Sequence, residues 1–121
     1  MVISTPFVLA STSRSRILIL KKIGLEFISI KHNCNESHYK KKFKRLKYSS
    51  KEVSLELSKI KAKSVSANLM NKLVVGSDTV IDYKGNIIDK VKTMKKAHQK
   101  IKKLSGKKHT IISSIAAYYN N

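Results

Sequence analysis

The chain has 121 residues, of which 41% are hydrophobic and 27% charged, and its formal net charge at pH 7 is +19. This length predicts a single domain covering residues 1–121, and the apolar content excludes an intrinsically disordered chain. No apolar run approaches the roughly 18 residues of a membrane-spanning helix, so we expect no membrane association and a cytoplasmic location. The single cysteine, Cys34, excludes an internal disulfide.

The first elements form the most informative stretch of the sequence, FVLASTSRSRILILKKIG, which covers residues 7–24. Phe7 to Ala10 is a short apolar run that predicts a buried strand, and after a serine-rich loop the sequence predicts a helix ending at Gly24. A helix that follows such a loop turns free backbone N–H groups toward an anion, and Arg14 and Arg16 lie in its first turn. A capped strand-to-helix connection without a ligand is the equally weighted alternative.

The middle of the chain predicts a second strand and a long helix. Residues 26–31 alternate like a strand, and residues 32–48 are polar and Lys-rich, which predicts a long loop or a frayed helix. A capping box, S-x-x-E at residues 49–52, opens a helix that we expect to reach about Leu69, with Lys61 lying off its buried face. That face comprises Val53, Leu57, Ile60, Ser64 and Ala67.

The remaining elements complete an α/β pattern. Residues 72–80 predict a buried strand that stops at the sequence GSDT, followed by a hairpin through residues 80–88. Thr93 is expected to cap a helix ended by Gly106, and residues 109–119 predict the last strand. The buried face of that helix is expected to hold Met94, Ala97, Ile101 and Leu104. The predicted fold class is α/β, a mixed sheet flanked by helices.

Asp78 is the strongest single candidate for chemistry, because only seven residues of this basic chain are acidic. It follows the apolar run LVVG, so we expect its carboxylate at the carboxyl edge of the sheet, where open α/β sheets bind ligands. There it could hold a divalent metal or activate water as a general base. An Asx turn that closes the strand is the alternative.

The positive charge does not by itself predict a nucleic-acid partner. Only three of the 26 basic residues are arginines, whereas base readout and phosphate forks favour arginine. Solvated lysines explain the charge, and a basic surface also attracts polyphosphate substrates.

Four separated segments, in order and spacing, resemble the Maf-type nucleoside triphosphate pyrophosphatases. LASTSRSRILILKKIGLEF resembles that family's LASxSPRRxxLLxxxGxxF, and Ile60-Lys61-Ala62 falls where the family has Glu-Lys-Ala. VVGSDTVIDYKGNIIDKV resembles VIGADTVVxxDGxILxKP, and LSGKKHTIISSIA resembles LSGRxHxVxTxVA. The resemblance covers nearly the whole chain and implies an inosine triphosphate pyrophosphatase-like fold.

The resemblance also implies a site and a reaction. Asp78 matches the family's presumed general base, and Glu36 matches a metal-binding Glu, so that Glu36 and Asp78 are the expected metal contacts. The expected phosphate-binding residues are Ser11, Ser13, Arg16, Lys61 and Lys90. Such enzymes hydrolyse canonical or modified nucleoside triphosphates to the monophosphate and pyrophosphate with Mg²⁺ or Mn²⁺, which cleans the nucleotide pool.

The departures from the family pattern define the alternatives. Arg14 and Ser15 stand where the family has Pro-Arg, Ile60 replaces a Glu, and Asn35 replaces an Asp. Relative to the family the sequence lacks the C-terminal part, so it represents the N-terminal two-thirds of the fold. The alternative to a pyrophosphatase is therefore a non-catalytic remnant that binds nucleotide or a partner chain without turnover. Pairing of the final strand with a second copy, as a homodimer, is a further expectation.

Overall fold

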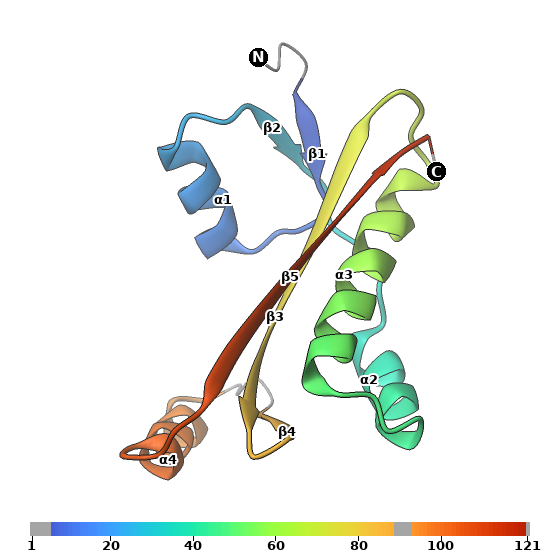
Figure 1. Cartoon of the computed structure of the whole chain (residues 1–121). Coiled ribbons are helices and arrows are strands. Elements are labelled where there is room, and N and C mark those ends of the chain that lie inside the picture. The colour runs from blue at the N-terminus through green and yellow to red at the C-terminus, as the bar shows by residue number, and fades with distance from the viewer. Residues whose placement is uncertain (1–5, 89–92, 121) are drawn as a thin grey trace.

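The computed structural model describes residues 6–88 and 93–120, which form one five-stranded sheet with helices on both sides (Figure 1). The elements follow the predicted order, with one helix more than predicted. In chain order they are β1 (Phe7–Leu9), α1 (Arg14–Lys22), β2 (Phe27–Ser29), α2 (Glu36–Arg45), α3 (Ser50–Ser66), β3 (Leu73–Tyr83), β4 (Asn86–Ile88), α4 (Met94–Leu104) and β5 (Thr110–Tyr119). The predicted α/β class with a mixed sheet flanked by helices is confirmed.

The additional helix is α2, which occupies the segment predicted as a loop or a frayed helix. The side chain of Asn35 caps it by accepting a hydrogen bond from the backbone N–H of His38. Phe43 anchors it in a hydrophobic cluster with Val53 and Leu57 of α3. A capping asparagine and one buried aromatic residue therefore order a segment whose other residues are mostly polar.

The sheet combines parallel and antiparallel pairing around β3. β1 pairs in parallel with β2 and with the start of β3, whereas β4 and β5 both pair antiparallel with β3. On the edge of β3 that faces β1 and β4, the pairing with β1 ends at Val75 and the pairing with β4 begins at Ile81. Among residues 6–88 and 93–120, the pairing partners of residues 76–80 therefore all lie on β5.

The length of β3 corrects one prediction. The sequence GSDT was expected to end the strand, but β3 continues without a break to Tyr83. Gly76 has a different purpose: a Cβ atom there would lie 2.3 Å from the carbonyl oxygen of Ser58, so the glycine lets α3 approach the strand closely. Asp78 lies in the middle of a strand, at the level where its neighbour β1 has already ended.

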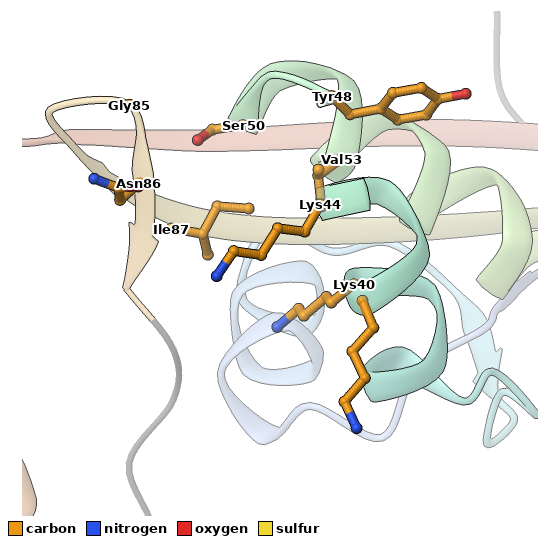
Figure 2. A pocket seen from close by; sticks show the side chains of 9 residues that line it. Lys40, Lys44, Tyr48, Ser50, Val53, Gly85, Asn86 and Ile87 are labelled. Atoms are coloured by element: carbon orange, nitrogen blue, oxygen red, sulfur yellow. The ribbon is translucent and has the colours of Figure 1, made fainter. Parts of the chain in front are cut away.

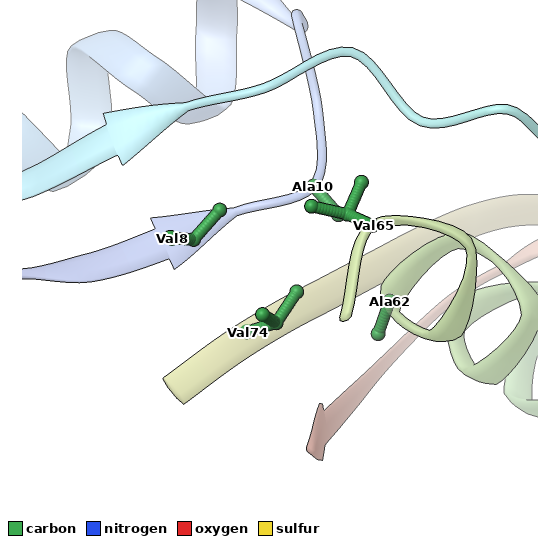
Figure 3. Close-up of a cluster of buried hydrophobic side chains, with 5 residues drawn as sticks. All are labelled: Val8, Ala10, Ala62, Val65 and Val74. Atoms are coloured by element: carbon green, nitrogen blue, oxygen red, sulfur yellow. The ribbon is translucent and has the colours of Figure 1, made fainter. Parts of the chain in front are cut away.

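The main core lies between α3 and the parallel part of the sheet. The side chains of Val8, Ala10, Ala62, Val65 and Val74 form this cluster (Figure 3). Short serines on α3, Ser54 and Ser58, are also fully buried, which allows the helix to lie close to β3. The buried face of α3 is rotated relative to the prediction, because Lys61 is buried whereas Ala67 is exposed.

The prediction for α4 was correct in its caps and wrong in its buried face. Thr93 caps the helix and Gly106 follows its end with a positive φ. Met94 and Ile101, however, are 87% and 69% exposed, and no residue of α4 is buried. Figure 1 shows the reason, because α4 lies at the far end of the β3 and β5 ribbon and not against a face of the sheet.

Candidate active site

The loop between β1 and α1 is held in shape by its own serines. Ser11 is buried, and its Oγ accepts a hydrogen bond from the backbone N–H of Ser13 at 3.0 Å. The Ser29 hydroxyl donates to the carbonyl oxygen of Ser11. Ser13 is the N-cap of α1, and its Oγ accepts from the backbone N–H of Arg16 at 3.5 Å. These bonds fix the N-terminus of α1, whose remaining free N–H groups and positive dipole end favour an anion.

Asp78 and Lys61 form a buried ion pair behind this loop. The side chain of Lys61 lies on α3, and its ammonium group donates to Oδ1 of Asp78 at 2.8 Å. The residues are 4% and 3% exposed, respectively. The same ammonium group also contacts Glu36, the first residue of α2. One cation thus joins two carboxylates that come from β3 and α2.

The surroundings of Lys61 stabilise its charged form. Burial alone lowers the pKa of a lysine, but hydrogen bonds to Asp78 and Glu36 and the attraction of both carboxylates outweigh burial and raise the pKa of Lys61 above its usual value. Burial has the opposite consequence for the nearby thiol, because it raises the pKa of Cys34 despite the positive charge of Lys61. Cys34 is therefore a poor nucleophile at neutral pH.

The second oxygen of Asp78 is the unusual atom of the site. Oδ2 is buried and has no hydrogen-bond partner among the described residues. An unpartnered buried carboxylate oxygen is costly, so such atoms call for a ligand or a functional explanation. Here the oxygen is available to accept a proton or to bind a cation.

Arg16 reaches the same region from the other side of the sheet. Its Nη2 donates to Oγ1 of Thr79 at 3.3 Å, and Thr79 in turn shares a 2.9 Å hydrogen bond with the hydroxyl of Ser113 on β5. Thr79 and Ser113 are directly paired across the β3 and β5 strands. The hydroxyl pair therefore holds the guanidinium group at Thr79, the residue next to Asp78 on β3.

A cavity of about 510 Å³ unites these groups. Its polar lining includes the N-terminus of α1, Arg16, Glu36 and Asp78, and its apolar lining comes from α1, β3 and β4. The lining residues are Ser13, Ser15, Arg16, Ile19, Glu36, Lys40, Asp78, Thr79, Val80, Ile81, Ile87, Ile88 and Lys100. The cavity thus offers charged and polar groups to an anion and apolar side chains to an uncharged group.

The two carboxylates fit a magnesium-type cation only in part. Mg²⁺ in phosphate-transfer sites is held by one or two carboxylates together with substrate phosphates, and the free Oδ2 of Asp78 is a suitable ligand. Within the described part of the chain, no group of three or more His, Cys, Asp or Glu side chains could hold a metal ion. Glu36 and Asp78 would therefore need the substrate's own oxygens to complete the coordination.

The structure brings together most of the residues singled out from the sequence, in differing ways. Ser13, Arg16, Glu36 and Asp78 line the cavity. Ser11 does not line the cavity, and its hydroxyl instead accepts a hydrogen bond from the backbone N–H of Ser13 within the loop. The ammonium group of Lys61 contacts carboxylates, so that its expected contact with phosphate stays a prediction. Lys90 lies outside the described residues.

Sequence reasoning missed Thr79, Ser15 and two lysines, Lys40 and Lys100, that line the cavity. Thr79 had a usable signal, since it adjoins Asp78 in a strand that the hairpin prediction cut short. Lys40 and Lys100 had none, because nothing in the sequence distinguishes them from the other lysines.

Taken together, fold and site define an α/β protein in which the N-terminus of α1 lines one cavity with two carboxylates, the buried Asp78 and the half-buried Glu36. The Maf-like protein family matches residues 6–121, and the chain therefore belongs to this family. Among residues 6–88 and 93–120, no helix is both long and apolar enough to cross a membrane.

The chain is similar to several pyrophosphatases of this family. It is 38% identical over 113 residues to the 7-methyl-GTP pyrophosphatase of Bartonella henselae, covering 93% of this chain and 56% of the relative. It is 34% identical over 107 residues to a dTTP/UTP pyrophosphatase of Fusobacterium nucleatum, covering 88% and 52%. It is 32% identical over 108 residues to a nucleoside triphosphate pyrophosphatase of Pelagibacter ubique, covering 89% and 55%. The chain thus spans little more than half the length of these relatives.

Proposed function

We propose that this chain hydrolyses nucleoside triphosphates to the monophosphate and pyrophosphate. The observation that carries the proposal is the buried Asp78, which lines one cavity with Ser13 and Arg16 and whose Oδ2 has no hydrogen-bond partner among the described residues. A helix N-terminus favours the binding of phosphates, and a carboxylate oxygen without a partner can accept a proton from water, so the two groups together suit hydrolysis of a phosphoanhydride. The names of the relatives support the same reaction class.

Each residue has a defined task in this reaction. The backbone N–H groups of α1 and the guanidinium group of Arg16 bind the phosphates. Lys61 holds Oδ1 of Asp78, which leaves Oδ2 to accept a proton from the attacking water. The water oxygen bonds to the α-phosphorus, the bond from that phosphorus to the bridging oxygen breaks, and pyrophosphate leaves. A divalent cation, Mg²⁺ or Mn²⁺, held by Glu36 and Asp78 would neutralise phosphate charge, and Oδ2 of Asp78 would then be a ligand of the cation in place of a proton acceptor.

The proposal is tested by Asp78→Asn, which removes the proton acceptor with little change of shape. We expect pyrophosphate release to fall at least about 100-fold, the usual contribution of a general base, while nucleotide binding persists. The matched control is Asp82→Asn on the same strand, whose carboxylate is bonded to Ser50 and Gly85 and does not line the cavity. Unchanged hydrolysis in Asp78→Asn would remove Asp78 from the mechanism.

The substrate should be sought among nucleotides rather than assumed, because the named relatives differ in theirs. The purified chain would be incubated with canonical triphosphates and with 7-methyl-GTP, in Mg²⁺ and in Mn²⁺, and pyrophosphate release measured. Thermal stabilisation by the same nucleotides would be recorded in parallel.

Nucleotide binding without turnover is the second candidate. It is favoured by Lys61, whose ammonium group already contacts both carboxylates of the site, Glu36 and Asp78. Nucleotide-dependent stabilisation without pyrophosphate release in the unaltered chain would support it. If no nucleotide stabilises the chain and none yields pyrophosphate, both candidates are contradicted. A cytoplasmic location and a homodimer remain predictions of the same proposal.

A further inference from the structure

A second cavity, distinct from the candidate active site, lies between α2, the start of α3 and the β3–β4 hairpin (Figure 2). Its volume is about 360 Å³, at the lower end of the range for small-molecule sites. We name it the lysine cavity after the three lysines of α2 that line it. Its lining residues are Lys40, Lys41, Lys44, Tyr48, Ser50, Val53, Gly85, Asn86 and Ile87.

The lining of the lysine cavity carries the positive charge of three lysines, while the carboxylate of Asp82 bonds two other lining residues, Ser50 and Gly85. No carboxylate is found among its described lining residues, whereas the candidate active site contains Glu36 and Asp78. Within the described part of the chain, Lys41 and Lys44 form no ion pair. Lys41 and Lys44 are three residues apart on α2, and like charges at this spacing repel each other. An anion bound between them would remove that repulsion.

The walls of the lysine cavity are fixed by contacts of their own. Oδ2 of Asp82 accepts a hydrogen bond from the hydroxyl of Ser50, and its Oδ1 accepts from the backbone N–H of Gly85 at 3.1 Å. This carboxylate thus ties the first residue of α3 to the turn of the hairpin. On the opposite side, Phe43 packs with Val53 and holds α2 against α3. The cavity is preorganised and need not form around its ligand.

The shape of the site favours a compact anion over a nucleobase. Figure 2 shows Lys44 extended toward Ile87 and Asn86, while the ring of Tyr48 points away from them. Tyr48 instead stacks on Phe43, with ring centroids 5.0 Å apart. No aromatic face therefore lies over the lysines to stack on a base.

We propose that the lysine cavity is a second anion site, which binds the phosphate groups of a compact polyphosphate. Because Lys40 and Ile87 line both cavities, such an anion would lie directly beside the candidate active site. The identification of the anion as pyrophosphate rests on the proposed function, which releases it. The triphosphate of a second nucleotide is the other source of the same chemistry.

The test measures pyrophosphate binding by calorimetry in metal-free buffer at physiological ionic strength. Lys44→Gln removes one positive charge from the lysine cavity. Lys42→Gln is the matched control, since it removes the same charge from the same helix at an exposed position that does not line the cavity. We expect Lys44→Gln to weaken one binding event at least about 10-fold and Lys42→Gln to change it less than about 2-fold. Equal weakening by both variants would show that the binding depends only on the net charge of the chain, and it would overturn the proposal.

Two further measurements separate the sources and the sites. Arg16→Gln should leave the binding event at the lysine cavity intact, and loss of all binding in that variant would overturn the second site. A non-hydrolysable triphosphate analogue that competes for the Lys44-dependent event would identify a nucleotide's phosphates as a ligand, and absence of competition would assign the event to pyrophosphate. None of these readouts requires hydrolysis, so they hold whether or not Asp78→Asn confirms the proposed function.

Discussion

The ammonium group of Lys61 lies between two carboxylates at a place almost closed to water. If it is removed, Asp78 stays buried without a positive partner, and breaking such a pair typically costs about 3–5 kcal/mol. We therefore expect Lys61→Met to lower the free energy of unfolding by about this amount near neutral pH. Urea denaturation followed by circular dichroism measures it.

The pKa of Lys61 adds a pH dependence to this prediction. Because the pKa is raised in the folded chain, the stabilisation is complete below the ordinary value of 10.5 and is lost as the pH rises through the folded-state pKa. The difference in stability between the unaltered chain and Lys61→Met should therefore shrink above pH 10.5. Lys63→Met, at an exposed position two residues further on, should change stability by less than about 0.5 kcal/mol. A similar loss in both variants would contradict the role of the ion pair.

Single residues differ in how far the sequence reveals them. The sequence singles out Asp78 as a candidate for the site, because an acidic residue after an apolar run is rare in a chain with only seven acidic residues. The contacts of Lys61 cannot be predicted from the sequence, because nothing there distinguishes a buried lysine from the many exposed ones. The hydroxyl pair of Thr79 and Ser113 depends on a strand register that only the folded sheet defines.

Among the elements, β3 depends on Gly76 for the close approach of α3. A methyl group at this position would lie 2.3 Å from the carbonyl oxygen of Ser58 and 2.7 Å from the backbone nitrogen of Ala62. Backbone atoms cannot move aside as a flexible side chain does, so we expect Gly76→Ala to destabilise the fold by about 1–3 kcal/mol. Thermal unfolding measures this loss, and the control is Ser77→Ala at the next, half-buried position. A melting temperature equal to that of Ser77→Ala would show that the helix can shift at no cost.

The elements themselves were predicted better than their environments. The caps at Ser49 and Thr93 mark two helix starts correctly, because N-capping is a local interaction between neighbouring residues. The buried face of α4 was wrong, since burial depends on what packs against a helix and not on its own periodicity. The predicted end of β3 was also wrong, because Gly76 permits close packing of α3 and does not form a turn.

For the whole molecule, the charge of +19 predicts that binding to DNA, if measured, is a salt-dependent background. A protein that contacts 6–10 phosphates loses roughly 10³–10⁵ in affinity between 50 and 200 mM salt. We expect DNA affinity to fall by this order and nucleoside triphosphate affinity to fall far less, because the cavity surrounds its ligand. Fluorescence anisotropy at several salt concentrations measures both. Tight DNA binding that is insensitive to salt would contradict the nucleotide proposal.

β3 pairs in parallel with β1 and antiparallel with β4, and we expect these two pairings to form at different times during folding. The β3–β4 hairpin closes through a turn at Lys84 and Gly85, both with positive φ, and such hairpins form within about 1–10 μs. Val8 of β1, in contrast, pairs with Val74 only after the long intervening chain has closed on itself, which is slow. Since the loop after β1 carries the N-terminus of α1 to Asp78, we expect the candidate active site to be the last part of the molecule to assemble.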